Sequence, residues 1–136
     1  MKRRIALTVL LLFNFSALVS CNAPPQPTPE EKAVLDSLKT LQQGYDRQIS
    51  VDEFALLLAV ASNTIDDLKK TASGNSCFLN AANRCYSSYE ISQKAWKLKE
   101  EAPNENRRVD LETTLSFTIG FAAISLAKAN ECFLRK

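Results

Sequence analysis

The chain has 136 residues, of which 46% are hydrophobic and 24% are charged, and this length and composition suit one globular domain. Its formal net charge of +2 is too small to indicate nucleic-acid binding. The absence of histidine excludes Ser-His-Asp and Cys-His catalytic arrangements, and three glycines are too few for a phosphate-binding glycine loop. We therefore expect a protein that is not an enzyme and that uses no cofactor and no metal site.

The first 20 residues have the pattern of a secretory signal peptide. Lys2, Arg3 and Arg4 form a basic n-region, and residues 5–19 form a hydrophobic stretch. The length of this stretch matches an h-region and is shorter than the roughly 20 residues that a transmembrane helix needs. We therefore expect residues 1–20 to be cleaved during export.

The signal peptide ends in Leu18-Val19-Ser20-Cys21. This quartet resembles the lipobox of bacterial lipoproteins, and the resemblance covers only the leader and Cys21. It implies that Cys21 carries a diacylglycerol thioether, that cleavage occurs before it, and that its new amino group is acylated, typically with palmitate. Two or three acyl chains, at about 0.8 kcal/mol per buried methylene, make a firm membrane anchor. The alternative is an ordinary secretory cleavage site beside a cysteine.

Residues 21–29 are predicted to link the anchor to a folded domain over residues 30–136. In lipoproteins of diderm bacteria, an aspartate after the lipidated cysteine commonly signals inner-membrane retention, so Asn22 favours the outer membrane. Four of the five prolines lie between Pro24 and Pro29, and such a run favours an extended polyproline II tether. We therefore expect a lipid-anchored, extracytoplasmic protein of the bacterial cell envelope.

Beyond the tether the hydrophobic pattern is helical, and we expect an all-α, up-and-down four-helix bundle. The first helix is expected over about Pro29–Gln43, with Gly44 as its stop. The second is expected to begin at a capping box formed by Ser50 and Glu53 and to end at Gly74. Its apolar seam has heptad spacing and consists of Val51, Phe54, Leu58, Ala61, Ile65, Leu68 and Ala72.

The third helix is expected over about Ser76–Glu101, and a capping box at Ser87 and Glu90 is an alternative start. One face of this helix is predicted to enter the core. That face consists of Phe78, Ala82, Cys85, Tyr89, Ser92 and Trp96.

The fourth helix is expected to begin near Asn106–Asp110 and to end near Phe133. Residues 115–127 are apolar on nearly all sides, so we expect the most buried helix of the domain. Gly120 and Ala123 would then allow a neighbouring helix to approach closely. The alternative is a face for a membrane or a partner.

Three cysteines remain in the exported domain, namely Cys77, Cys85 and Cys132. If the third and fourth helices form a hairpin that turns near Pro103–Asn104, Cys77 and Cys132 lie opposite each other. Cys85 is then offset from Cys132 by roughly 12 Å along the helices, beyond disulfide reach. We therefore expect a Cys77–Cys132 disulfide with Cys85 reduced and packed in the core. The alternative joins Cys77 to Cys85 in a loop and leaves Cys132 free.

Three aromatic residues of the third helix, Tyr86, Tyr89 and Trp96, are candidates for a groove or a partner contact. Aromatic side chains with a polar group need water or a hydrogen-bond partner, which favours such sites. Core packing is the interpretation that we favour for these side chains, and the groove is the alternative.

We expect the protein to act by protein binding, as an accessory or adaptor for an unidentified envelope protein, with no nucleic-acid partner. The alternative is a carrier of a lipid or other apolar ligand. An adaptor needs a packed core and an exposed apolar or aromatic patch, whereas a carrier needs an apolar cavity between its helices. Removal of residues 1–20 removes three basic residues and no acidic one, which leaves 14 basic and 15 acidic residues. We therefore expect Cys21, and not surface charge, to hold the domain at the membrane.

Overall fold

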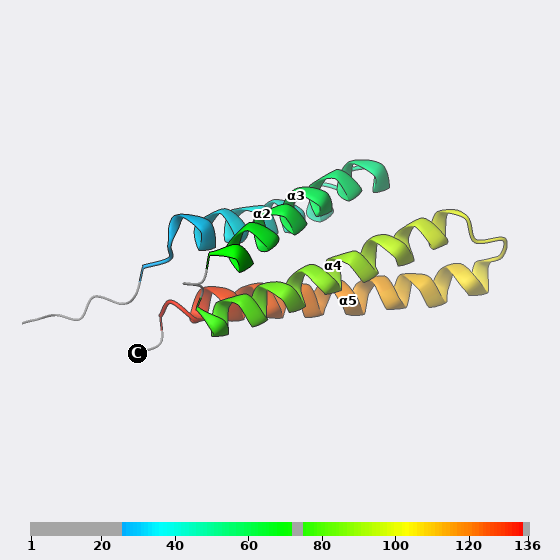
Figure 1. Cartoon of the computed structure of the whole chain (residues 1–136). Helices are drawn as coiled ribbons and strands as arrows, with labels where there is room; N and C mark the ends of the chain where they lie inside the picture. Colours follow the sequence, from blue (N-terminus) through cyan, green and yellow to red (C-terminus); the bar gives the residue numbers. More distant parts are fainter. Residues whose placement is uncertain (1–25, 72–74, 135–136) are drawn as a thin grey trace, which may run out of the picture.

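The computed structural model describes residues 26–71 and 75–134, which form four α-helices and no strand. The helices are α2 (Pro29–Asp46), α3 (Val51–Lys70), α4 (Ser76–Glu100) and α5 (Glu105–Glu131). Figure 1 shows α2 and α3 as one antiparallel hairpin that packs against a second, longer hairpin of α4 and α5. The predicted all-α, up-and-down four-helix bundle is confirmed. The signal peptide, Cys21 and the tether up to Pro25 lie outside the described residues.

A polar side chain caps the N-terminus of each described helix. At α3, the Ser50 hydroxyl accepts a hydrogen bond from the Glu53 amide, and the Glu53 carboxylate accepts one from the Ser50 amide. Thr28 and Glu31 make the same reciprocal pair at α2. The backbone and side-chain hydrogen bonds from Ser50 lower the pKa of the Glu53 carboxyl because they favour its charged form. The predicted capping box is therefore present.

The end of α2 differs from the prediction. The helix continues through Gly44 to Asp46, and Gly44 is buried inside it. A Cβ at this position would lie 2.9 Å from the terminal Cδ1 atoms of Ile49 and Leu57. Gly44 therefore allows close packing between α2 and α3 and does not stop the helix. The chain turns instead at Gln48, which has a φ of 55° in the left-handed region.

The boundaries of α3 and α4 agree more closely with the prediction. α4 begins at Ser76, so the alternative start at Ser87 is wrong. α3 ends at Lys70, and the predicted stop at Gly74 lies outside the described residues. Most of the predicted seam residues of both helices are buried, namely Val51, Phe54, Leu58, Ala61, Ile65, Leu68, Phe78, Ala82, Cys85, Tyr89 and Ser92.

Aromatic rings fill the space between the two hairpins. The ring centroid of Phe54 lies 5.9 Å from that of Tyr89 and 6.0 Å from that of Trp96. Tyr45 lies 6.0 Å from Trp96 in an edge-to-face arrangement. These ring contacts join α2, α3 and α4.

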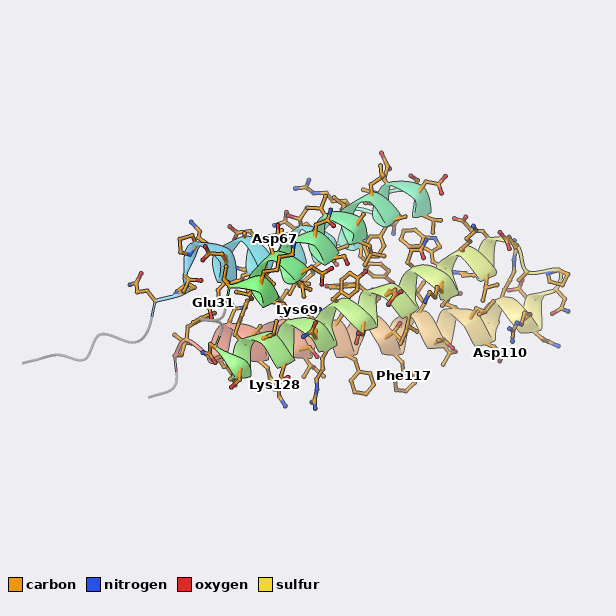
Figure 2. The ribbon with its side chains drawn as sticks, in the orientation of Figure 1. Glu31, Asp67, Lys69, Asp110, Phe117 and Lys128 are labelled. Atoms are coloured by element: carbon orange, nitrogen blue, oxygen red, sulfur yellow. A yellow bond between two sulfur atoms is a disulfide. The ribbon has the colours of Figure 1, made fainter. Side chains whose placement is uncertain are left out.

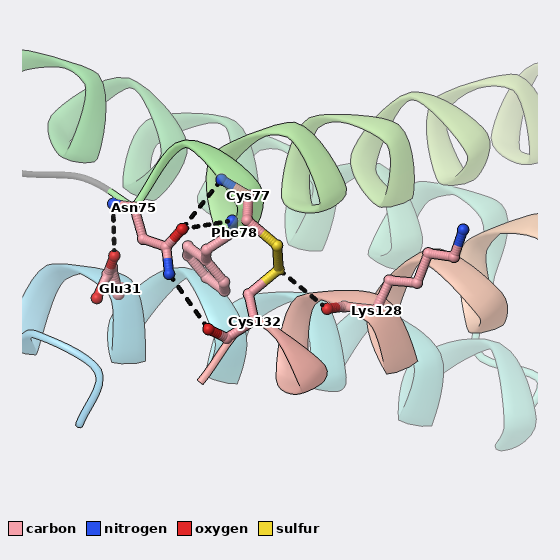
Figure 3. The surroundings of a disulfide bond; sticks show 6 residues. All are labelled: Glu31, Asn75, Cys77, Phe78, Lys128 and Cys132. Carbon is pink, nitrogen blue, oxygen red and sulfur yellow. Dashed lines mark hydrogen bonds between the residues drawn. A yellow bond between two sulfur atoms is a disulfide. The ribbon is translucent and has the colours of Figure 1, made fainter. Parts of the chain in front are cut away.

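A disulfide and a polar cluster hold one end of the bundle (Figure 3). Cys77 and Cys132 are bonded, with their Cα atoms 5.9 Å apart, so the predicted disulfide is confirmed. Asn75 Oδ1 accepts hydrogen bonds from the amides of Cys77 and Phe78, and Asn75 Nδ2 donates to the Cys132 carbonyl. The backbone N–H of Asn75 donates a hydrogen bond to the buried Glu31 carboxylate, with an N–O distance of 2.9 Å. One asparagine therefore connects the starts of α2 and α4 to the end of α5.

The double substitution Cys77→Ser/Cys132→Ser should lower the free energy of unfolding by about 4 kcal/mol. The disulfide joins residues 55 positions apart, and it restricts the entropy of the unfolded chain accordingly. Urea unfolding followed by circular dichroism measures the loss. Added reductant should destabilise the wild type by a similar amount and should leave the double variant unchanged. An unaltered urea midpoint in the double variant would contradict this role.

Candidate functional site

α5 carries apolar side chains on two opposite faces. Its inward face is buried against the rest of the bundle and consists of Leu111, Leu115, Ala122, Leu126 and Ala129. On the outward face, Phe117, Phe121 and Ile124 are 66%, 59% and 57% exposed. Their spacing of four and three residues places them in one row along the helix. Figure 2 shows Phe117 projecting from the side of α5 that is turned away from α2 and α3.

The prediction that α5 is the most buried helix is wrong. A helix in a four-helix bundle meets its neighbours only on its inward side, so a helix that is apolar on all sides keeps one face in solvent. Gly120 is exposed, and nothing lies within 4 Å of the place where its Cβ would be, so it mediates no close approach. Among the described residues, α5 alone is long and apolar enough to cross a membrane by length and composition.

A groove of about 820 Å³ runs between α4 and α5 beside this row. Ala81 and Ile91 of α4 and Phe121 and Ile124 of α5 supply its apolar lining. The Cys77–Cys132 disulfide also contributes to the lining. The polar part of the lining consists of Asn80, Asn83, Arg84, Ser87, Ser88, Ser125, Lys128 and Glu131. The groove and the exposed row therefore form one continuous surface of the α4–α5 hairpin.

The three candidate aromatic residues of α4 lie outside the groove. Tyr89 is 1% exposed, and its hydroxyl has no hydrogen-bond partner among the described residues. Burial raises the pKa of the Tyr89 phenol because it disfavours the charged form. Tyr86 and Trp96 are half-buried and pack against the core. None of the three lines the groove, and among the described aromatic residues Phe117 and Phe121 are the exposed ones.

In the described part of the chain, the cysteines are either joined in the disulfide or buried in the core. Within residues 26–71 and 75–134, no cluster of cysteine or acidic side chains could hold a metal ion. The Cys85 thiol is reduced and buried in the core, where desolvation raises its pKa to about 12. Comparisons of the chain with protein-family models, with curated proteins and with solved structures find no match.

Cys85 should resist alkylation by iodoacetamide in the folded chain at pH 8. With a pKa of about 12, only about one Cys85 thiol in ten thousand is a thiolate at that pH. In urea the pKa returns to about 8.5, and labelling should become fast. Mass spectrometry of the peptide that contains Cys85 measures both rates. Equal rates in the folded and unfolded chain would contradict the buried position.

Proposed function

We propose that the protein is a lipid-anchored, extracytoplasmic adaptor of the bacterial cell envelope that binds another protein through the outer face of the α4–α5 hairpin. The observation that carries this proposal is the exposed row of Phe117, Phe121 and Ile124 beside the groove. A contiguous apolar patch on a soluble surface is typical of an interaction site. Aromatic residues are also enriched among the side chains that dominate protein interfaces.

The proposed anchor is compatible with this use of the surface. α2 begins eight residues after Cys21, and an extended tether of that length spans on the order of 20 Å. Figure 1 places the start of α2 and the end of α5 at the same end of the bundle, whereas the α4–α5 turn lies at the other end. Lipid on Cys21 would hold one end of the bundle and leave the long outer face of α5 accessible.

The carrier alternative has less support. A carrier needs an apolar cavity between its helices. Large side chains occupy the centre of the bundle, and the largest of those that are fully buried are Tyr89, Phe54, Phe78, Leu38, Leu41 and Leu68. The groove of about 820 Å³ lies open on the surface of the α4–α5 hairpin and is not an enclosed cavity between the four helices. These features suit a protein contact better than an enclosed lipid.

Replacement of Phe117 and Phe121 by serine should abolish capture of the partner. The experiment is chemical crosslinking of the tagged full chain in the cells that produce it, followed by affinity purification. Because both side chains are more than half exposed, the double variant should unfold within about 0.5 kcal/mol of the wild type. Loss of capture would therefore result from the changed surface and not from unfolding of the protein.

Leu56→Ser/Val60→Ser is the matched control. These two α3 residues are also large, apolar and exposed, at 69% and 54%, and neither lines the groove. The control variant should capture the same partner as the wild type. If both double variants captured it equally well, the α5 face would not be the binding surface. Recovery of bound lipid without any protein would instead support the carrier.

A further inference from the structure

The exposed row of α5 is the centre of a longer stripe with coiled-coil spacing. Steps of four and three residues alternate along it, and every member is exposed. We call this stripe the α5 seam, and it consists of Asp110, Thr114, Phe117, Phe121, Ile124 and Lys128. An average spacing of 3.5 residues is the pattern by which two helices pack side by side.

The seam has an acidic end, an apolar centre and a basic end. Asp110 and Lys128 are 18 residues apart, or about 27 Å along the helix axis. Neither side chain has an ion-pair partner among the described residues. Figure 2 shows Asp110, Phe117 and Lys128 on the same side of α5. A surface with this order of charges is complementary to a reversed copy of itself.

We infer that the partner on this face is a second copy of the chain, packed antiparallel along the α5 seam. The inference rests on the proposed function, because it takes the outer face of α5 to be a binding surface. In a parallel pair, Asp110 would face Asp110 and Lys128 would face Lys128. In an antiparallel pair, the register that packs Phe117 against Phe121 of the second copy also sets Asp110 against Lys128 and Thr114 against Ile124.

The same charges select the register. A shift of one heptad in one direction would set Phe117 against Lys128 of the second copy. A shift in the other direction would set Phe121 against Asp110. Each shift would place a charged group against an aromatic ring and would separate the opposite charges. A lipid surface suits the seam less well, because it would also have to accommodate the Asp110 carboxylate.

The apolar contact area is sufficient for a weak dimer. An aromatic side chain presents about 200 Å² of surface, so Phe117 and Phe121 together expose about 250 Å² per copy. With the rest of the seam, the pair would bury about 1,000 Å² in total, which is close to the lower limit for a specific interface. Two copies anchored in one membrane would be confined to a thin layer, and the higher local concentration would favour the pair.

The test is site-specific photocrosslinking of the full chain in its membrane. Phe121 is replaced by p-benzoylphenylalanine, and two copies with different affinity tags are produced together. When Asp110 and Lys128 are unchanged, irradiation should give a crosslinked product of twice the chain mass that carries both tags. Asp110→Lys alone and Lys128→Asp alone should each lower its yield by about tenfold or more, since each sets like charges together at both ends of the seam.

Production of the two variants together should restore the product, because each copy then supplies the charge that the other lacks. Asp36→Lys and Lys39→Asp are the matched controls, since both residues are exposed on α2, and they should leave the yield unchanged. A doubled product that persists in both seam variants overturns the antiparallel register. Crosslinking only to a different protein overturns the inference that the partner is a second copy, but it agrees with the proposed adaptor function. Crosslinking only to lipid, or to nothing, overturns both.

Discussion

The Cys77–Cys132 disulfide closes the α4–α5 hairpin at the end opposite its turn, and α2 and α3 pack against this closed pair. The bond and the turn together keep α4 and α5 side by side along their length. Beside the disulfide, the backbone N–H of Asn75 donates a hydrogen bond to the Glu31 carboxylate. This bond fixes the start of α2 at the same end of the bundle. α2 and α3 then cover one side of the hairpin, and the outer side of α5 remains in solvent.

Local signals in the sequence predicted most of the fold. The Ser50 and Glu53 capping box depends only on residues three apart, and the disulfide followed from the register of an antiparallel hairpin. The role of Gly44 could not be predicted in this way, because a glycine that ends a helix and one that admits a neighbouring helix have the same local sequence. The contacts that Ile49 and Leu57 make with it are tertiary.

The site was harder to predict than the fold, for a physical reason. Residues 115–127 are apolar on nearly all sides, so the sequence pattern alone does not show which face of this helix is buried and which is exposed. Only the packing against α4 shows that Phe117 and Phe121 face outward. Tyr89 and Trp96, by contrast, lie on the face of the third helix that the pattern predicted to enter the core, and both rings pack against Phe54. The α5 seam and the groove share Phe121 and Ile124. A molecule that binds to the seam therefore also contacts residues that line the groove.

The proposed function requires that the anchored chain present Phe117 and Phe121 to water while its core remains closed. Hydroxyl-radical footprinting of the full chain tests this directly when single molecules are held in separate lipid nanodiscs. We expect Phe117 and Phe121 to be oxidised at rates close to those of the unfolded chain, and Phe54 and Phe78, both 0% exposed, to be strongly protected. Equal protection of all four phenylalanines would show that the outer face of α5 is covered by the chain itself or by lipid, and would contradict the account.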